Sequence, residues 1–391
     1  MQSRFYNVGI LSLSNAFGFA VTSMMMLIGS LLGTELAPSE NWATLPIAIM
    51  VIGTACGVIP VTRLMAKLGR KYTLSIFLLL SASTCLVASY SVAIKSFELF
   101  CFCAAMIGVS NAALQQVRFA AMESVSPDKA TTAASIVMLS GVAAAFIGPE
   151  LAVYGRSLTG VDYQGSFWLV AACSVIAALI LTQFTPAPIN TSQEAQSTRS
   201  LREIISNPGL QLAVVSGLIA YVVMSFIMTG TPISMHNHHG HSLEDTKWVI
   251  QSHIAAMFLP SLVTPLLFNW VGIRGMMLTG LLCYGITIVI GLIDSSVMGY
   301  WSQLVMLGIG WNFLFIAGTS LLPRTYLPGE QYKAQAFNDS IVFSTQAMAS
   351  LSAGWAISVS SWQTMLLICL LPIAVMIGML IRTKPNDIPR P

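Results

Sequence analysis

The chain has 391 residues, of which 55% are hydrophobic and 8% are charged, and its formal net charge at pH 7 is +3. A soluble globular domain carries about a quarter charged residues, so this composition excludes a water-soluble fold and indicates that lipid surrounds most of the chain. The small net charge gives no indication of nucleic-acid binding. The seven cysteines all fall within apolar runs and do not indicate a disulfide framework.

The hydropathy pattern predicts an all-α membrane protein with twelve transmembrane helices. Each apolar run is close to the ~20 residues that cross the hydrocarbon core of a bilayer. The first run is too long for a signal-peptide core and is expected to remain as a span. The predicted spans are 7–32, 43–64, 73–93, 97–117, 132–153, 166–183, 209–229, 248–269, 275–293, 298–321, 336–357 and 362–381.

A polar segment, TPAPINTSQEAQSTRSLREIISN, separates the sixth span from the seventh. Its content of Pro, Ser and Gln indicates a flexible connector. We therefore expect an N-terminal six-helix bundle (1–184), a cytoplasmic linker (185–208) and a C-terminal six-helix bundle (209–391). Two such bundles are typical of secondary transporters that are built from repeats and bind their solute near the membrane midplane.

Lysine and arginine placement predicts the orientation, because these residues are more frequent in cytoplasmic segments. If the N-terminus is cytoplasmic, fifteen of them fall inside and three fall outside. The outer three are Lys95, Arg156 and Lys247. Both termini and the linker are thus predicted to be cytoplasmic, and the loop between spans seven and eight is predicted to face outward.

The turn RLMAKLGRKY between spans two and three resembles the signature loop of the major facilitator superfamily. Gly69, Arg70 and Lys71 match the pattern, whereas Thr62 and Ala66 replace its usual Gly and Asp. A weaker version, VGIRG, stands at the equivalent turn of the second half. The resemblance implies that the first three residues belong to a conformational loop. No Walker A pattern is present, so ATP is not expected to drive transport directly.

All five histidines fall within 18 residues, around the predicted outer loop between spans seven and eight. The loop fits a metal-capture site and a solvated polar turn about equally well. Its candidate capture residues are Met235, His236, His238, His239 and His241.

Two motifs flank this loop, Met-x-x-x-Met in span seven and His-x-x-x-Met in span eight. They pair Met224 with Met228 and His253 with Met257. Residues four apart share one face of a helix. Met224 and His253 each lie about five residues from the outer end of their helix, roughly 7–8 Å deep at 1.5 Å per residue. Adjacent antiparallel helices could therefore bring this thioether and imidazole together.

Thioether sulfur suits Cu(I), and imidazole binds Cu, Zn, Fe and Ni. A site of neutral Met and His ligands therefore favours copper, and it avoids burying an unpaired anion in the bilayer. The competing interpretation is packing, because methionine commonly fills gaps between apolar helices.

Together the two motifs resemble the CcoA-type copper importers of the major facilitator superfamily, a bacterial inner-membrane subgroup whose close relatives are thought to move riboflavin. The resemblance assigns the metal to Met224, Met228, His253 and Met257. It implies import of copper for haem–copper oxidase assembly, with copper as cargo and no prosthetic group. The expected partners are the lipid bilayer and a cytoplasmic copper chaperone or oxidase assembly factors, with no nucleic acid. The expected oligomeric state is a monomer.

Two rival functions remain open. A carrier of small organic solutes, of the riboflavin or drug–proton antiporter type, is supported by Gly148 and Pro149, which resemble part of an antiporter motif. Beside them, Glu150 is a candidate for proton coupling or a structural acid near the outer end of span five, and Asp339 in span eleven has the same ambiguity. A non-transporting metal sensor is the second rival. No nucleophile–base constellation or cofactor loop indicates an enzyme.

Overall fold

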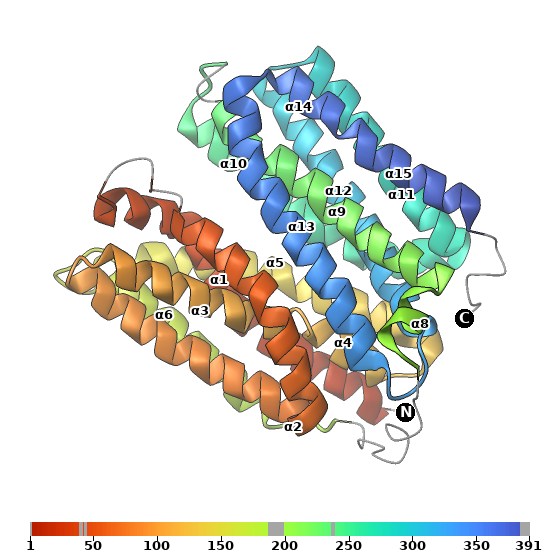
Figure 1. Ribbon diagram of the computed structural model, residues 1–391. Helices are drawn as coiled ribbons and strands as arrows, with labels where there is room; N and C mark the ends of the chain where they lie inside the picture. Colours follow the sequence, from red (N-terminus) through yellow and green to blue (C-terminus); the bar gives the residue numbers. More distant parts are fainter. Residues whose placement is uncertain (1, 39–41, 43–44, 187–198, 236–238, 384–391) are drawn as a thin grey trace. The chain divides into compact units, whose positions relative to one another are not determined.

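The structure is a computed structural model that describes residues 2–38, 42, 45–186, 199–235 and 239–383 (Figure 1). The chain forms two compact units, unit 1 (1–190) and unit 2 (191–391). Within the described residues, the regular structure is entirely helical.

Unit 1 pairs its long helices closely. Its elements are α1 (Gln2–Leu36), α2 (Leu45–Ala93), α3 (Phe97–Leu114), α4 (Val117–Glu123), the 3-10 turn η2 (Pro127–Lys129), α5 (Ala130–Arg156) and α6 (Gln164–Leu181). Helix α2 packs mainly against α3, and α1 packs mainly against α5. A Cβ atom on Gly108 would lie 2.0 Å from the carbonyl oxygen of Met50, so the absence of a side chain lets α2 and α3 touch backbone to backbone.

Unit 2 is organised around α12. Its elements are α8 (Leu201–Ile205), α9 (Pro208–Ile233), α10 (Leu243–Phe258), η4 (Leu259–Leu262), α11 (Thr264–Ile293), α12 (Val297–Leu321), η5 (Leu322–Arg324), α13 (Gln331–Val359), α14 (Trp362–Ile368) and α15 (Leu370–Arg382). Helix α12 packs against α9, α10 and α11, and α9 also packs against α13 (Figure 1).

Nine helical segments among the described residues are long and apolar enough to cross a membrane. The segment α2 accounts for two predicted spans, because the non-helical backbone at Gly69 divides it into two helices. Predicted span eight is divided between the short helix α10 and the start of α11, and α13 carries buried polar residues that include Gln335 and Asp339. The architecture therefore agrees with the predicted twelve-helix, all-α membrane fold.

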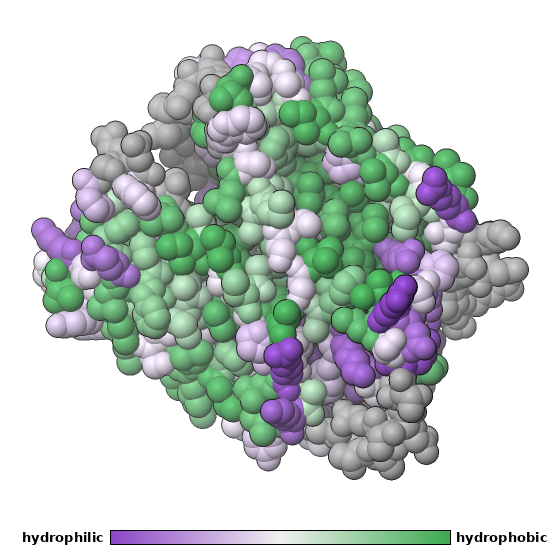
Figure 2. Space-filling view, viewed as in Figure 1, coloured by the Kyte–Doolittle hydropathy of each residue, from purple (hydrophilic) through white to green (hydrophobic). Residues whose placement is uncertain are grey.

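The surface is that of a multi-pass membrane protein. Hydrophobic residues cover most of the visible face in Figure 2. Large apolar side chains are strongly exposed on unit 2, among them Trp270 at 82% and Ile293 at 78%. Apolar exposure on this scale is unfavourable in water, whereas lipid is a suitable solvent for it.

Half of the predicted linker, residues 187–198, lies outside the described residues. Its C-terminal part is held on unit 2, because Arg199 forms an ion pair with the fully buried carboxylate of Glu330. Ser200 and Glu203 then form a capping box at the start of α8.

The two signature turns share a rare backbone conformation. Gly69 in α2 has φ 79° and ψ 167°, and Gly272 in α11 has φ 66° and ψ −175°. This region is accessible essentially only to glycine. The two halves thus use the same glycine conformation to reverse the chain between consecutive spans, as expected for a structural repeat.

The arginine that follows each glycine anchors its turn. Arg70 is buried and donates from Nε and Nη2 to Glu123 of α4, with both distances 2.5 Å. Lys71 donates to the carbonyl of Thr182, and Arg274 in unit 2 donates from Nη1 to the carbonyl of Thr383 at 2.9 Å. An acid from α4 thus pairs with the signature loop, although the usual Asp of that loop is missing.

Replacement of Gly272 by alanine isolates this backbone effect, because nothing lies within 4 Å of the added Cβ. We expect Gly272→Ala to cost about 1–3 kcal/mol of stability, since a non-glycine residue is strained at this φ. Gly285→Ala is the matched control, because its Cβ also meets nothing and its helical backbone favours alanine. The measurement is thermal unfolding in detergent, and equal midpoints for the two variants would contradict the prediction.

Candidate functional site

His253 has one ring nitrogen fixed and the other without a partner. The side chain is fully buried on α10, and Nδ1 lies 2.8 Å from the carbonyl oxygen of Leu304 on α12. A carbonyl only accepts hydrogen bonds, so Nδ1 carries the hydrogen and Nε2 presents a lone pair. Nε2 has no hydrogen-bond partner among the described residues. Such a buried acceptor is a candidate contact for a solute or a metal ion.

Met257 follows one turn later on the same face of α10 and is also buried. Close approach of α12 sets the position of this face. A Cβ atom on Gly308 would lie 2.8 Å from the carbonyl oxygen of His253. The prediction that these two side chains share a face is therefore compatible with their burial, whereas their role in binding metal stays a prediction.

The methionines of α9 have different environments. Met224 is buried, with the Ser225 hydroxyl 3.8 Å from its sulfur, and Met228 is partly exposed. Helices α9 and α10 each pack against α12 and make little direct contact with each other. The expected meeting of Met224 with His253 across adjacent helices therefore stays a prediction. No group of three or more His, Cys, Asp or Glu side chains in the described part of the chain could hold a metal.

Around the same helices lies an aromatic cluster, which comprises Tyr221, Phe258, Trp311, Phe315 and Phe343. The Tyr221 ring meets Trp311, Phe315 and Phe343 edge to face at 5.3, 5.2 and 5.5 Å between centroids. Phe258 meets Trp311 at 6.0 Å. The cluster therefore joins α9, α10, α12 and α13 beside the helix segments that carry Met224 and His253.

Trp311 brings a buried donor to this region. Its indole Nε1 has no hydrogen-bond partner among the described residues, and the side chain is 1% exposed. Buried polar groups are nearly always paired in native proteins. Unit 2 thus holds an unpaired acceptor on His253 and an unpaired donor on Trp311, and the indole of Trp301 and the amide of Gln303 on the same helix also lack partners among the described residues. Sequence inspection did not single out Trp311, although a tryptophan inside an apolar span is a signal that its N–H needs a partner.

The loop histidines that the structure describes form hydrogen bonds at the predicted outer end of unit 2. His239 Nδ1 lies 2.9 Å from the carbonyl oxygen of Ser234 and 3.0 Å from the Tyr300 hydroxyl. His241 Nε2 lies 2.7 Å from the carbonyl oxygen of Ser295. The two rings are nearly parallel, 6.3 Å apart. Each carbonyl again selects the tautomer, so that each neutral ring keeps its other nitrogen unprotonated.

The other residues of the predicted capture site are either poorly placed to capture a metal ion or lie outside the described residues. Met235 is fully buried instead of exposed. His236 and His238 lie outside the described residues. In the loop that receives His241, hydrogen bonds from the backbone and side chain of Ser296 lower the pKa of Asp294 and keep its carboxylate ionised.

The acids considered for proton coupling have opposite environments. Glu150 is exposed on α5. Asp339 is fully buried on α13 and accepts a hydrogen bond of 2.7 Å from Asn338. A buried acid in a membrane span is the better candidate for a functional group, so the structure favours Asp339 over Glu150 in this respect.

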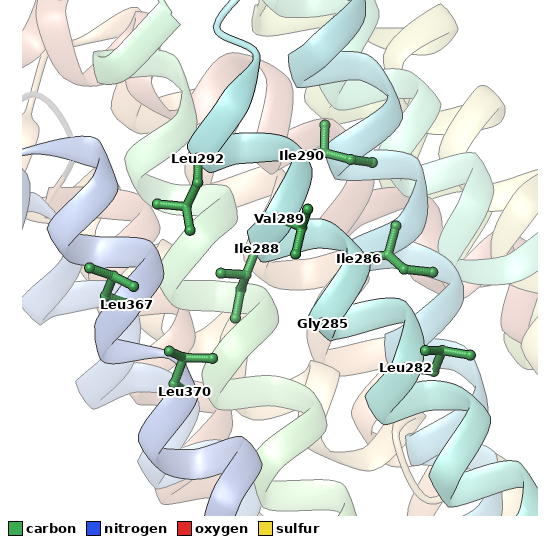
Figure 3. Close-up of a pocket in the computed structure, with 9 residues that line it drawn as sticks. All are labelled: Leu282, Gly285, Ile286, Ile288, Val289, Ile290, Leu292, Leu367 and Leu370. Atoms are coloured by element: carbon green, nitrogen blue, oxygen red, sulfur yellow. The ribbon is translucent and has the colours of Figure 1, made fainter.

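A groove of about 510 Å³ on unit 2 is formed by α11, α14 and α15 (Figure 3). Only apolar side chains and Gly285 line it, and several of them, such as Leu282 and Val289, are strongly exposed. A polar solute would find no hydrogen-bonding side chain there. The groove is therefore a membrane-facing surface and is separate from the polar groups of His253 and Trp311.

Comparisons with known proteins agree on the family. The profile of the Major Facilitator Superfamily matches residues 8–249. The riboflavin transporter RfnT of Brucella anthropi is 32% identical over 384 residues, which cover 97% of this chain and 96% of RfnT. An uncharacterised transporter of the superfamily from Bacillus subtilis, YddS, is 30% identical over 372 residues, which cover 90% of this chain and 85% of YddS.

Solved structures share the fold at low sequence identity. The fucose:proton symporter FucP of E. coli superposes with a TM-score of 0.77 at 13% identity, covering 98% of this chain and all of FucP. The human organic anion transporter MFSD10 superposes with a TM-score of 0.78 at 12% identity, covering 96% of this chain and 99% of MFSD10. With the paired spans, the twin glycine turns and the matches across its length, the chain belongs to the major facilitator superfamily of membrane transporters.

Proposed function

We propose that the protein is a secondary-active carrier of the bacterial cytoplasmic membrane that takes up a small organic solute with a flat, polar ring system, such as riboflavin. The observation that carries this proposal is the 32% identity with a riboflavin transporter across nearly the whole chain. Transport would proceed by alternating access, with both termini in the cytoplasm, as the lysine and arginine distribution predicts.

The buried polar atoms of unit 2 support a solute of this kind. The edge of a polar ring system carries both hydrogen-bond acceptors and donors. It could accept a bond from Trp311 Nε1 and donate one to His253 Nε2, which are two of the buried polar atoms of unit 2 that lack partners among the described residues. The aromatic cluster adds flat apolar surfaces, and small-molecule sites typically combine such surfaces with a few polar groups.

Removal of the indole N–H tests the hydrogen-bond donor without removing the aromatic ring. We expect Trp311→Phe to raise the KM for riboflavin about tenfold, the effect of losing a hydrogen bond worth about 1–1.5 kcal/mol. His253→Ala should weaken uptake at least as strongly, because it removes the acceptor. The measurement is uptake of tritiated riboflavin by purified protein in liposomes.

The control for these variants is His239→Ala, which changes a histidine on the predicted outer loop and should leave riboflavin uptake unchanged. If wild-type protein carries no riboflavin under an imposed proton gradient or membrane potential, the proposed cargo is wrong.

Copper import is the second candidate, and the geometry of His253 favours it. Histidines that bind metals almost always donate their other ring N–H to a carboxylate, carbonyl or water. The Nδ1 bond of His253 to Leu304 matches that arrangement. Together with the sulfurs of Met224, Met228 and Met257, Nε2 would form a neutral site suited to Cu(I). This carrier would supply a cytoplasmic copper chaperone or oxidase assembly factors.

The methionines separate the two cargoes, because a ring solute has no need of their sulfur. If copper is the cargo, Met224→Leu and Met257→Leu should each abolish uptake of radioactive copper, since leucine keeps the volume and removes the ligand. Riboflavin uptake should then be absent in all variants. The control is Met277→Leu, a fully buried methionine of α11 outside both motifs.

Liposome assays with Cu(I), Cu(II), Ag(I), Zn(II) and riboflavin in parallel decide between the candidates. If Met224→Leu and Met257→Leu both still take up copper, the methionine sulfurs are not required for copper transport. If both methionine variants still take up riboflavin and the protein takes up no copper, the organic solute is the only remaining candidate cargo.

A further inference from the structure

Predicted span eight, 248–269, is interrupted near its middle. Helix α10 ends at Phe258, the 3-10 turn η4 covers Leu259–Leu262, and α11 begins at Thr264. Pro260 within the turn has no N–H and cannot donate to the carbonyl of Ala256 four residues earlier. Where a helix breaks inside a bilayer, the freed backbone groups need partners from the protein itself.

Asn312 of α12 supplies one such partner and also bonds to two hydroxyls beside the break. Its amide is fully buried, and Nδ2 donates to the carbonyl oxygen of Met257 at 2.7 Å and to Ser261 Oγ at 2.8 Å. Its Oδ1 accepts from the hydroxyl of Thr264 at 3.1 Å. One side chain therefore bonds to the end of α10, to the turn η4 and to the start of α11.

The bond to Met257 connects Asn312 with the candidate site. On α12, Leu304, Gly308 and Asn312 are spaced four apart and share one face of the helix. Leu304 orients His253, Gly308 allows the backbones to touch, and Asn312 holds the carbonyl of Met257. This stripe sets both the depth and the rotation of the helical turn that presents His253 and Met257.

We propose that Asn312 is a positioning residue for solute binding, which holds the turn from His253 to Met257 in place through the break of span eight. The proposal rests on the proposed function, in which this turn contacts the cargo. Asn312 does not itself need to touch the solute. Groups that orient a metal-ligating side chain change metal affinity or activity 10- to 100-fold when they are replaced, and we expect an effect of similar size on solute binding here.

Asn312→Leu removes all three hydrogen bonds at nearly constant volume. We expect the KM for riboflavin, or for copper if copper is the transported species, to rise about tenfold with little change in the maximal rate. Thr264→Val is the milder second variant, because it removes the hydroxyl that lies near Asn312 Oδ1 and the carbonyl of Pro260 but keeps both bonds from Nδ2, and its effect should be smaller. The control is Thr287→Val, which removes a buried bond from α11 to the carbonyl of Gln303 on α12, away from the break.

Hydrogen exchange of α10 and η4 provides a readout that needs no cargo. Positioning predicts faster exchange there in Asn312→Leu but not in Thr287→Val. Faster exchange with an unchanged KM, while His253→Ala raises the KM, would overturn the proposal and leave the proposed function intact. If wild-type protein carries neither riboflavin nor copper, the proposed function fails. Faster exchange confined to Asn312→Leu would then still support positioning of the turn, and equal exchange in the two variants would overturn it.

Discussion

The candidate site depends on one constraint, which is that backbone polar groups inside a bilayer need partners within the protein. Span eight breaks between Phe258 and Thr264, and the amide of Asn312 bonds to both sides of the break. Because the same face of α12 also orients His253, α12 is the scaffold of the site. Helix α9, which we expected to lie beside α10, packs on α12 and α13 instead and makes little direct contact with α10.

The same constraint explains why two unpaired groups are informative. His253 Nε2 and Trp311 Nε1 are buried without hydrogen-bond partners among the described residues, and leaving a buried polar group unpaired costs about 1–3 kcal/mol. The complete pairing of Asn312 contrasts with these unpaired atoms, which are therefore candidates for contacts with a bound solute. A solute that forms a hydrogen bond with such an atom gains binding free energy partly because it removes this penalty.

The fold was largely predictable, because spans follow from hydropathy and length alone. Two departures have physical reasons. The proline turn at Pro260 shortens α10, and buried polar residues such as Asp339 make α13 less apolar. At the site, the spacing of His253 and Met257 was predictable because it is local. The partners of His253 and Met257 on α12 are 51 and 55 residues away in sequence, and no local pattern reports such a pairing.

The two cargoes differ in which of these observations they explain. A copper ion needs lone pairs, so it accounts for His253 Nε2 but gives the indole N–H of Trp311 no partner. A ring solute with both donors and acceptors accounts for both atoms and leaves the methionines as packing. Methionine packs readily in apolar helices without any ligand role, whereas a buried N–H without a partner is rare. The unpaired donor therefore favours an organic solute, in agreement with the 32% identity to the riboflavin transporter RfnT on which our proposal rests.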